Sequence, residues 1–270
     1  MKKKVKEPKP QKVKKNEIVE NKGITGMGTD YSVYILSSRE KILAVVAGVL
    51  VGFIASYIYF GNETLSVVIG LVAGYKAISI YRNKLQKDRK KKLRLQFRDM
   101  LESLSNSYTV GMTATRAFHT AYDDMVVEHG DDSYIAQELA LICSTHDNQG
   151  VEIKDMVRDF GIRSGIDDVK SFASVFSISS DLGGDIAKVI RETRDMISDK
   201  IETELEIQTM VTGQKNQLNI LAIMPFVVVV FSKAFDNGAG TGMIIIVKLI
   251  AMLLFIFAYW LGNKIVDIKV

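Results

Sequence analysis

Four long apolar runs, each with at most one charged residue, constrain this chain more than any other feature. The first is ILAVVAGVLVGFIASYIYF, residues 42–60, and the others lie at about 65–81, 216–233 and 243–262. An α-helix needs roughly 20 apolar residues to cross the hydrocarbon core of a bilayer. Buried helices of a soluble protein would instead have to hide nearly all of this apolar surface beside a separate polar domain. We therefore expect four membrane spans.

Two lysines interrupt these runs, and both lie away from the middle of the span. Lys76 is near the end of the second run and Lys248 is near the start of the fourth. A lysine stem at such a position can extend along the helix and place its ammonium group among the lipid headgroups. Neither lysine argues against the predicted spans.

The basic residues predict the orientation, because lysine and arginine flank membrane spans mainly on the cytoplasmic side. Residues 1–15 contain eight lysines and one glutamate, and residues 82–94 contain eight basic residues and one aspartate. Lys215 precedes the third run, and Lys264 follows the fourth. We expect a multi-pass protein of the cytoplasmic membrane with both termini inside the cell. Residues 1–38 lack the pattern of a cleaved signal peptide and are predicted to be a basic cytoplasmic tail.

The segment between the second and third runs has the pattern of a helical domain. From 95 to 212 it contains 10 basic and 22 acidic residues, and its apolar residues recur at helical spacing. No alternating β-pattern is present. The fold class is therefore predicted as all-α, with a cytoplasmic six-helix bundle at 82–215 between two transmembrane hairpins, 39–81 and 216–270. The expected inward faces include Phe97, Leu101, Phe118, Leu139, Phe160, Val175, Ile197 and Leu205.

Glycines and one proline mark the expected turns, bends and close contacts. Gly111, Gly183 and Gly184 are predicted to form turns between helices. A last long helix is expected to begin at Asp185 and to be interrupted near Gly213, and a mid-span proline should kink or weaken the third span. This proline is Pro225. The first two spans also contain two small-residue motifs, Gly48-x-x-x-Gly52 and Gly70-x-x-x-Gly74. These motifs reflect either the ordinary glycine content of membrane helices or tight helix packing.

Three glutamates of the long helix, Glu202, Glu204 and Glu206, are expected on its exposed side. A solvated acidic face explains them. The alternative is a surface that meets a basic partner protein.

The order of these parts resembles the type II secretion system F-domain family, and most of all its single-domain form in tight-adherence (Tad) pilus systems. The resemblance covers about 97–231. It includes FRDMLESLSNSYTVGMTATRAF and the run from FASVFSISSDLGGDIAKVIRETRDMISDK to the proline-containing span. Each motif is short, and together they are specific.

The resemblance implies a platform protein without enzymatic activity. Such a protein couples a hexameric cytoplasmic secretion ATPase to pilin subunits in the bilayer, and it partners a second platform protein or itself. No nucleic acid, cofactor or metal is expected, and membrane lipid surrounds the spans.

The residue chemistry points the same way. The sequence has no G-x-x-x-x-G-K-[ST] loop, no H-E-x-x-H and no C-x-x-C. The polar group formed by Glu128, His129, Asp131 and Asp132 is interpreted as loop solvation and helix capping, and Cys143 as a core residue. A membrane-anchored sensor remains the alternative function, although the predicted outer loops are small. A transporter would need a polar pathway through the spans.

Overall fold

The computed structural model describes residues 23, 26, 28–234, 255, 257–262 and 264, and every regular element among them is a helix. The helices are α1 (Ser38–Phe60), α2 (Glu63–Thr109), α3 (Ala114–His129), α4 (Tyr134–Gln149), α5 (Ile153–Ser164), α6 (Asp167–Leu182) and α7 (Ile186–Ala234). The all-helical prediction is confirmed for this part of the chain. Most of the predicted fourth run, 243–262, lies outside the described residues.

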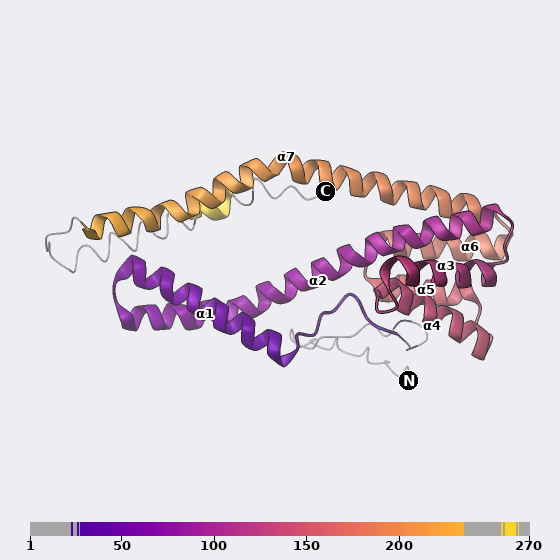
Figure 1. Cartoon of the computed structure of the whole chain (residues 1–270), viewed down its shortest axis with the longest axis horizontal. Coiled ribbons are helices and arrows are strands. Elements are labelled where there is room, and N and C mark those ends of the chain that lie inside the picture. The colour runs from indigo at the N-terminus through magenta and orange to yellow at the C-terminus, as the bar shows by residue number, and fades with distance from the viewer. Residues whose placement is uncertain are drawn as a thin grey trace, which may run out of the picture.

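Two long helices set the shape of the molecule. α2 has 47 residues and α7 has 49, and both extend from the apolar end of the molecule to the cluster of shorter helices at the other end (Figure 1). The basic run 82–94 lies inside α2 and is helical throughout. Lysine and arginine are good helix formers, so a high charge density does not end the helix.

α1 and α2 form an antiparallel hairpin. α1 ends at Gly61, which has φ of +67° and donates its backbone N–H to the carbonyl of Tyr57. Asn62 then begins α2, because its side chain accepts a hydrogen bond from the backbone N–H of Thr64 at 3.1 Å. The two-residue connection keeps the helices in contact along their length.

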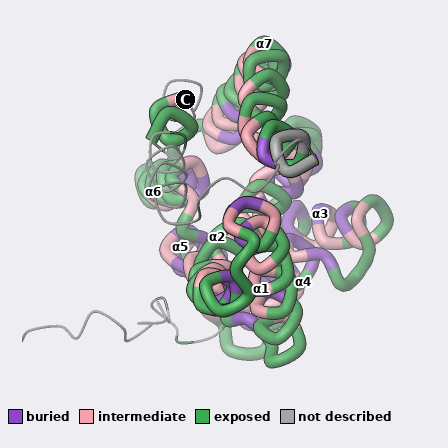
Figure 2. The backbone as a smooth tube through the Cα atoms, turned by 90° about the vertical axis from the view of Figure 1, so that its left-hand side faces the viewer, coloured by how far each residue is buried: buried purple, intermediate pink, exposed green. Residues whose placement is uncertain are grey.

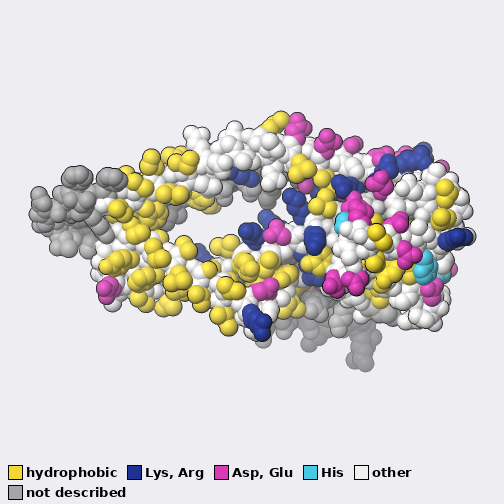
Figure 3. Space-filling model, viewed as in Figure 1, with side chains coloured by type: hydrophobic (Ala, Val, Ile, Leu, Met, Phe, Trp, Pro, Cys, Tyr) yellow, Lys and Arg dark blue, Asp and Glu magenta, His cyan; other side chains and the backbone are white. Residues whose placement is uncertain are grey.

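The hairpin carries its apolar side chains outward. α1 and the first part of α2 are each long and apolar enough to cross a membrane, and only 17% of the most apolar window of each helix is buried. Figure 2 shows α1 as mostly exposed or half-buried, with few buried residues, and Figure 3 shows hydrophobic side chains gathered over this end of the molecule. A helix of a soluble core would bury this face.

The shorter helices pack around the polar ends of α2 and α7. One continuous core joins α2 to α7, and its fully buried aromatic side chains are Tyr31, Phe97, Phe118, Phe160, Phe172 and Phe176. Thr113 and Ser133 cap α3 and α4, because their side-chain oxygens accept hydrogen bonds from backbone N–H groups of the first turn. Two residues expected on inward faces are exposed instead, Val175 by 47% and Leu205 by 52%.

Candidate functional site at the junction of the hairpin and the helical domain

The two long helices are joined by an arginine where they leave the helical domain. Arg94 of α2 contacts Asp168 of α6 through Nε at 2.8 Å and Glu204 of α7 through Nη1 at 2.7 Å. Lys200 of α7 reaches the other oxygen of Asp168 at 3.0 Å. These four residues form the Arg94 clamp. It ties three helices together. The space-filling view shows an opening between α2 and α7 (Figure 3).

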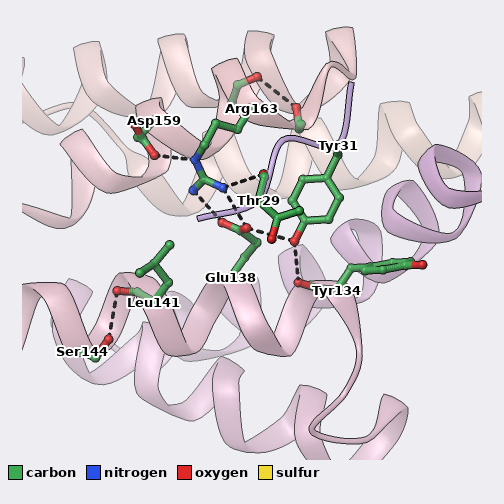
Figure 4. Close-up of polar contacts among 10 residues, drawn as sticks. Thr29, Tyr31, Tyr134, Glu138, Leu141, Ser144, Asp159 and Arg163 are labelled. Atoms are coloured by element: carbon green, nitrogen blue, oxygen red, sulfur yellow. Dashed lines mark hydrogen bonds and ion pairs between the residues drawn. The ribbon is translucent and has the colours of Figure 1, made fainter. Parts of the chain in front are cut away.

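A second ionic cluster lies inside the domain. Arg163 of α5 binds Glu138 of α4 with two parallel hydrogen bonds, Nη1 to Oε1 at 2.8 Å and Nη2 to Oε2 at 2.7 Å. Its Nε donates to Asp159 Oδ2 at 2.6 Å (Figure 4). Side chains of both Arg163 and Asp159 are fully buried. The bidentate geometry is the strong form of a charge-assisted hydrogen bond, and it fixes α5 against α4.

The chain before α1 enters this cluster. Arg163 Nη1 also donates to the carbonyl of Thr29 at 3.0 Å, and the hydroxyl of Tyr31 donates to Glu138 Oε1 at 2.9 Å. The backbone N–H of Tyr31 donates to the carbonyl of Arg163 at 2.9 Å. Tyr31 is only 1% exposed, and its ring meets Phe160 edge to face. Residues 28–37, which we call the strap, therefore fasten the start of α1 to the domain.

The strap is also fixed to α2. Gln86 donates its side-chain amide to the carbonyl of Ser32. The guanidinium of Arg89 lies over the ring of Tyr31, 4.6 Å from its centroid. A cation in this position is attracted to the ring face. Within the predicted basic tail, this last part is thus an ordered connection, and the hairpin meets the domain through both α2 and the strap.

The cluster shifts the pKa values of its members. Burial is the main reason why the pKa of Tyr31 is raised well above its usual value, and the negative charge of Glu138 raises it further. For Arg163, burial acts to lower the pKa, but the hydrogen bonds and charges of Glu138 and Asp159 outweigh it, so that the pKa is raised. The cluster consequently holds a neutral tyrosine and a charged arginine at every physiological pH.

The four glycines of the small-residue motifs lie at the contact between α1 and α2. A Cβ on Gly48 would come within 2.6 Å of the Cβ of Ala77, and one on Gly52 within 2.6 Å of the Cβ of Ala73. Gly74 is equally close to Val49, and Gly70 faces the carbonyl of Val49. These distances leave no room for a side chain. The close approach of the two backbones depends on glycine at these positions.

Of the residues expected at turns and bends, the glycines between helices lie in turns, whereas the two residues of the last long helix lie inside it. Gly111 and Gly183 have φ of +78° and +70° and end α2 and α6, and Gly184 donates its N–H to the carbonyl of Ser179 at 2.8 Å. Gly213 and Pro225 lie inside α7, which continues past both. The expected interruption near Gly213 is therefore wrong, because a single glycine weakens a long helix without ending it.

The three glutamates expected to face a partner divide into two groups. Glu202 and Glu206 are exposed. Glu204 points the other way and forms the ion pair with Arg94, so its assignment to the exposed side is wrong. The physical reason is helical spacing. Residues two apart on an α-helix lie about 200° from each other, so three alternate positions do not share one face.

The polar group near the end of α3 contacts Asp99 of α2. His129 Nε2 lies 3.0 Å from Asp99 Oδ2, and Arg98 takes the other oxygen of Asp99 at 2.6 Å. Glu128 comes within 3.9 Å of His129. The spacing of Asp99, Glu128 and His129 is compatible with a cation. However, the guanidinium on Asp99 already neutralises its charge and competes with a metal for its lone pairs.

Sequence reasoning missed the residues of the ionic cluster, although a signal for two of them was present. Arg163 follows Phe160 by three positions and Met156 by seven, so it lies on the apolar face of its helix. Glu138 follows Ile135 by three positions and precedes Ile142 by four, so it too lies on the apolar face of its helix. A charge of each sign on an apolar face indicates a buried pair. Tyr31 has no periodic context, so nothing in the sequence marked it as buried.

Comparison with known proteins adds no relative. No protein-family model, no curated protein and no solved structure matches this chain.

Proposed function

We propose that this chain is a platform protein of a Tad-like or type IV-like pilus, or of a type II secretion machine, in the cytoplasmic membrane. In this proposal the helical domain receives motion from a cytoplasmic secretion ATPase, and the membrane helices pass it to pilin subunits. The chain itself performs no catalysis. The proposal combines the F-domain resemblance with the physical features of the junction.

The exposed apolar surface supports the membrane placement. α1 has exposed apolar side chains along its length, among them Ile42, Leu43 and Val51. The end of α7 does the same with Ile220, Ile223 and Val228, each more than half exposed. An apolar surface of this extent is stable in lipid and unstable in water. We therefore place α1, the first part of α2 and the last part of α7 in the bilayer, with a fourth span at 243–262.

The observation that carries the coupling role is the continuity of α2 and α7. Each helix is one continuous element from the apolar end to the polar domain, and the one proline of α7, Pro225, lies in its apolar part, beyond the stretch that joins this part to the domain. An unbroken α-helix transmits displacement along its axis, and the Arg94 clamp makes the two helices move together at the domain. A displacement of the domain is then delivered to the membrane at two points.

The surfaces for partners follow from charge. Glu202 and Glu206 stay exposed on α7, beside other acidic residues of the same helix such as Asp195 and Asp199. These carboxylates offer a basic partner a complementary surface, and the hexameric ATPase is the proposed partner. A second platform protein, or a second copy of this chain, completes the proposed assembly in the membrane.

The test uses Gly213, the single glycine of α7, which makes no close contact. A Cβ on Gly213 would find no atom within 4 Å. Gly213→Pro breaks the hydrogen-bond ladder of α7, and Gly213→Ala strengthens the helix at the same position. In the native cells we expect the proline variant to be abundant and membrane-bound but to assemble no filament, while the alanine variant assembles filaments normally. Normal assembly with proline would refute the coupling role.

A further inference from the structure

A long open groove follows the contact between α1 and α2. Its volume is about 560 Å³, and its walls run from Leu43 to Ala55 on α1 and from Ala73 to Lys84 on α2. The groove exists because this side of the contact carries small residues. Glycines and alanines bring the backbones together and leave no bulky side chain to fill the space between the two helices.

The groove covers the depth of a single leaflet. Leu43 and Ala55 are 12 positions apart, which at 1.5 Å per residue is about 18 Å, close to half of a hydrocarbon core of about 30 Å. Between the end of the groove at Ala55 and the Gly61 turn, α1 carries the aromatic residues Tyr57, Tyr59 and Phe60. The groove therefore lies on the side of the membrane where the helical domain is.

The groove ends among basic residues. Lys84 lines its end next to the domain, and Tyr81 lies beside it at the level expected of an interfacial aromatic residue. Lys87 and Lys91 follow Lys84 by three and seven positions, so they continue the same face of α2. Asp88 is the one acidic residue in this stretch of the helix. The charge at this end is net positive.

We propose that the groove binds one phospholipid with an anionic headgroup, taken from the leaflet adjacent to the helical domain. One acyl chain lies in the groove, and Lys84 meets the phosphate. The lysines at the polar end of the groove favour an anionic lipid over a partner's transmembrane helix, because an apolar helix offers them no negative charge. The inference rests on the membrane placement proposed above, but not on a role in filament assembly.

The test measures which lipids stay bound to the full-length chain. The protein is reconstituted into vesicles of equal parts phosphatidylcholine and phosphatidylglycerol, extracted in mild detergent and weighed by native mass spectrometry. We expect one retained phosphatidylglycerol per chain. Ala47→Phe fills the groove from its exposed side and should abolish retention. Lys84→Gln should lower the preference for phosphatidylglycerol about fivefold, the equivalent of about 1 kcal/mol for one lysine near an anionic headgroup.

Two matched controls accompany these variants. Val46→Phe places the same phenyl side chain at an exposed position of α1 that does not line the groove, and Lys76→Gln removes a charge from α2 outside the groove. Both should retain lipid as the unchanged chain does.

Three results would overturn the inference. The first is that the Ala47→Phe chain retains as much lipid as the Val46→Phe chain. The second is that the unchanged chain shows no preference between the two lipids, and the third is a dimer in the spectrum that Ala47→Phe dissociates. The last result would assign the groove to a second copy of this chain. Lipid retention is independent of filament assembly, so a chain that retains lipid but builds no filament contradicts only the proposed function.

Discussion

Arg94 of α2 and Glu204 of α7 are 110 residues apart in the sequence and 2.7 Å apart in the structure. Their ion pair joins the two longest helices at the point where both leave the helical domain. Because Arg94 also binds Asp168 of α6, one guanidinium of α2 connects that helix to both α6 and α7. The strap makes an independent connection through Tyr31. The hairpin and the domain are thus linked as one mechanical unit.

Loss of the buried arginine should destabilise the domain strongly. Arg163→Met leaves the carboxylates of Glu138 and Asp159 buried without their cation, which costs about 3–5 kcal/mol. Urea unfolding of the full chain in detergent, followed by circular dichroism, measures the change. Arg158→Met on the exposed side of the same helix is the control and should alter the free energy of unfolding by less than about 0.5 kcal/mol. Equal effects of the two substitutions would contradict a structural role for the cluster.

The stability of the domain should fall at alkaline pH because of Tyr31. The pKa of this phenol is raised in the folded state, mainly by burial, so folding favours its protonated form. The stabilisation is complete below the ordinary pKa of about 10 and is lost as the pH rises toward the folded-state pKa. We expect the free energy of unfolding to decrease above about pH 10 in the unchanged chain and to decrease less steeply in Tyr31→Phe. Tyr122→Phe is the control. If it makes the decrease in the free energy of unfolding equally less steep, Tyr31 is not the cause.

A side chain at the closest contact of the hairpin should separate α1 from α2. A Cβ on Gly52 would lie 2.6 Å from the Cβ of Ala73 and 3.2 Å from the Cα of Gly70. Gly52→Val should therefore destabilise the hairpin by about 1–3 kcal/mol. The midpoint of thermal unfolding in detergent reports the change. Leu50→Val, at an exposed position two residues away, is the control, and an equal midpoint for the two variants would argue against tight packing.

The single cysteine should react slowly in the native chain. Burial is the main reason why the pKa of Cys143 is raised to about 11, and the negative charges of Asp147 and Asp123 add to it. Only the thiolate is nucleophilic, and little of it is present at neutral pH. Iodoacetamide should label Cys143 slowly in native protein and rapidly in urea. In a Cys143→Ser, Ser144→Cys chain the exposed thiol should react rapidly without urea. Fast native labelling of Cys143 would contradict a core position.

Much of the helical domain could be predicted from the sequence. The apolar spacing in α3 and the capping residues Thr113 and Ser133 are local signals, and the structure agrees with them. The same spacing placed Phe118 on the buried face, where the structure has it. These predictions succeed because burial in a short amphipathic helix is decided by residues within a few turns of one another.

The contacts that join hairpin and domain could not be predicted in the same way. Tyr31 meets Glu138 across 107 residues of sequence, and Arg163 meets the carbonyl of Thr29 across 134. No periodic pattern encodes which distant residues meet. The extent of α2 was missed for another reason. The change from apolar to basic composition at Arg82 marks a change of surroundings, while the backbone remains helical on both sides.

The central claim is that α1 and the first part of α2 cross a membrane while the helical domain stays on one side of it. Fusions of a reporter pair, alkaline phosphatase and a fluorescent protein, to the chain at Asn62 and at Asn148 test this directly. We predict phosphatase activity at Asn62, in the turn of the hairpin, and fluorescence without phosphatase activity at Asn148, at the end of α4. Both fusions reporting the same compartment would contradict the account.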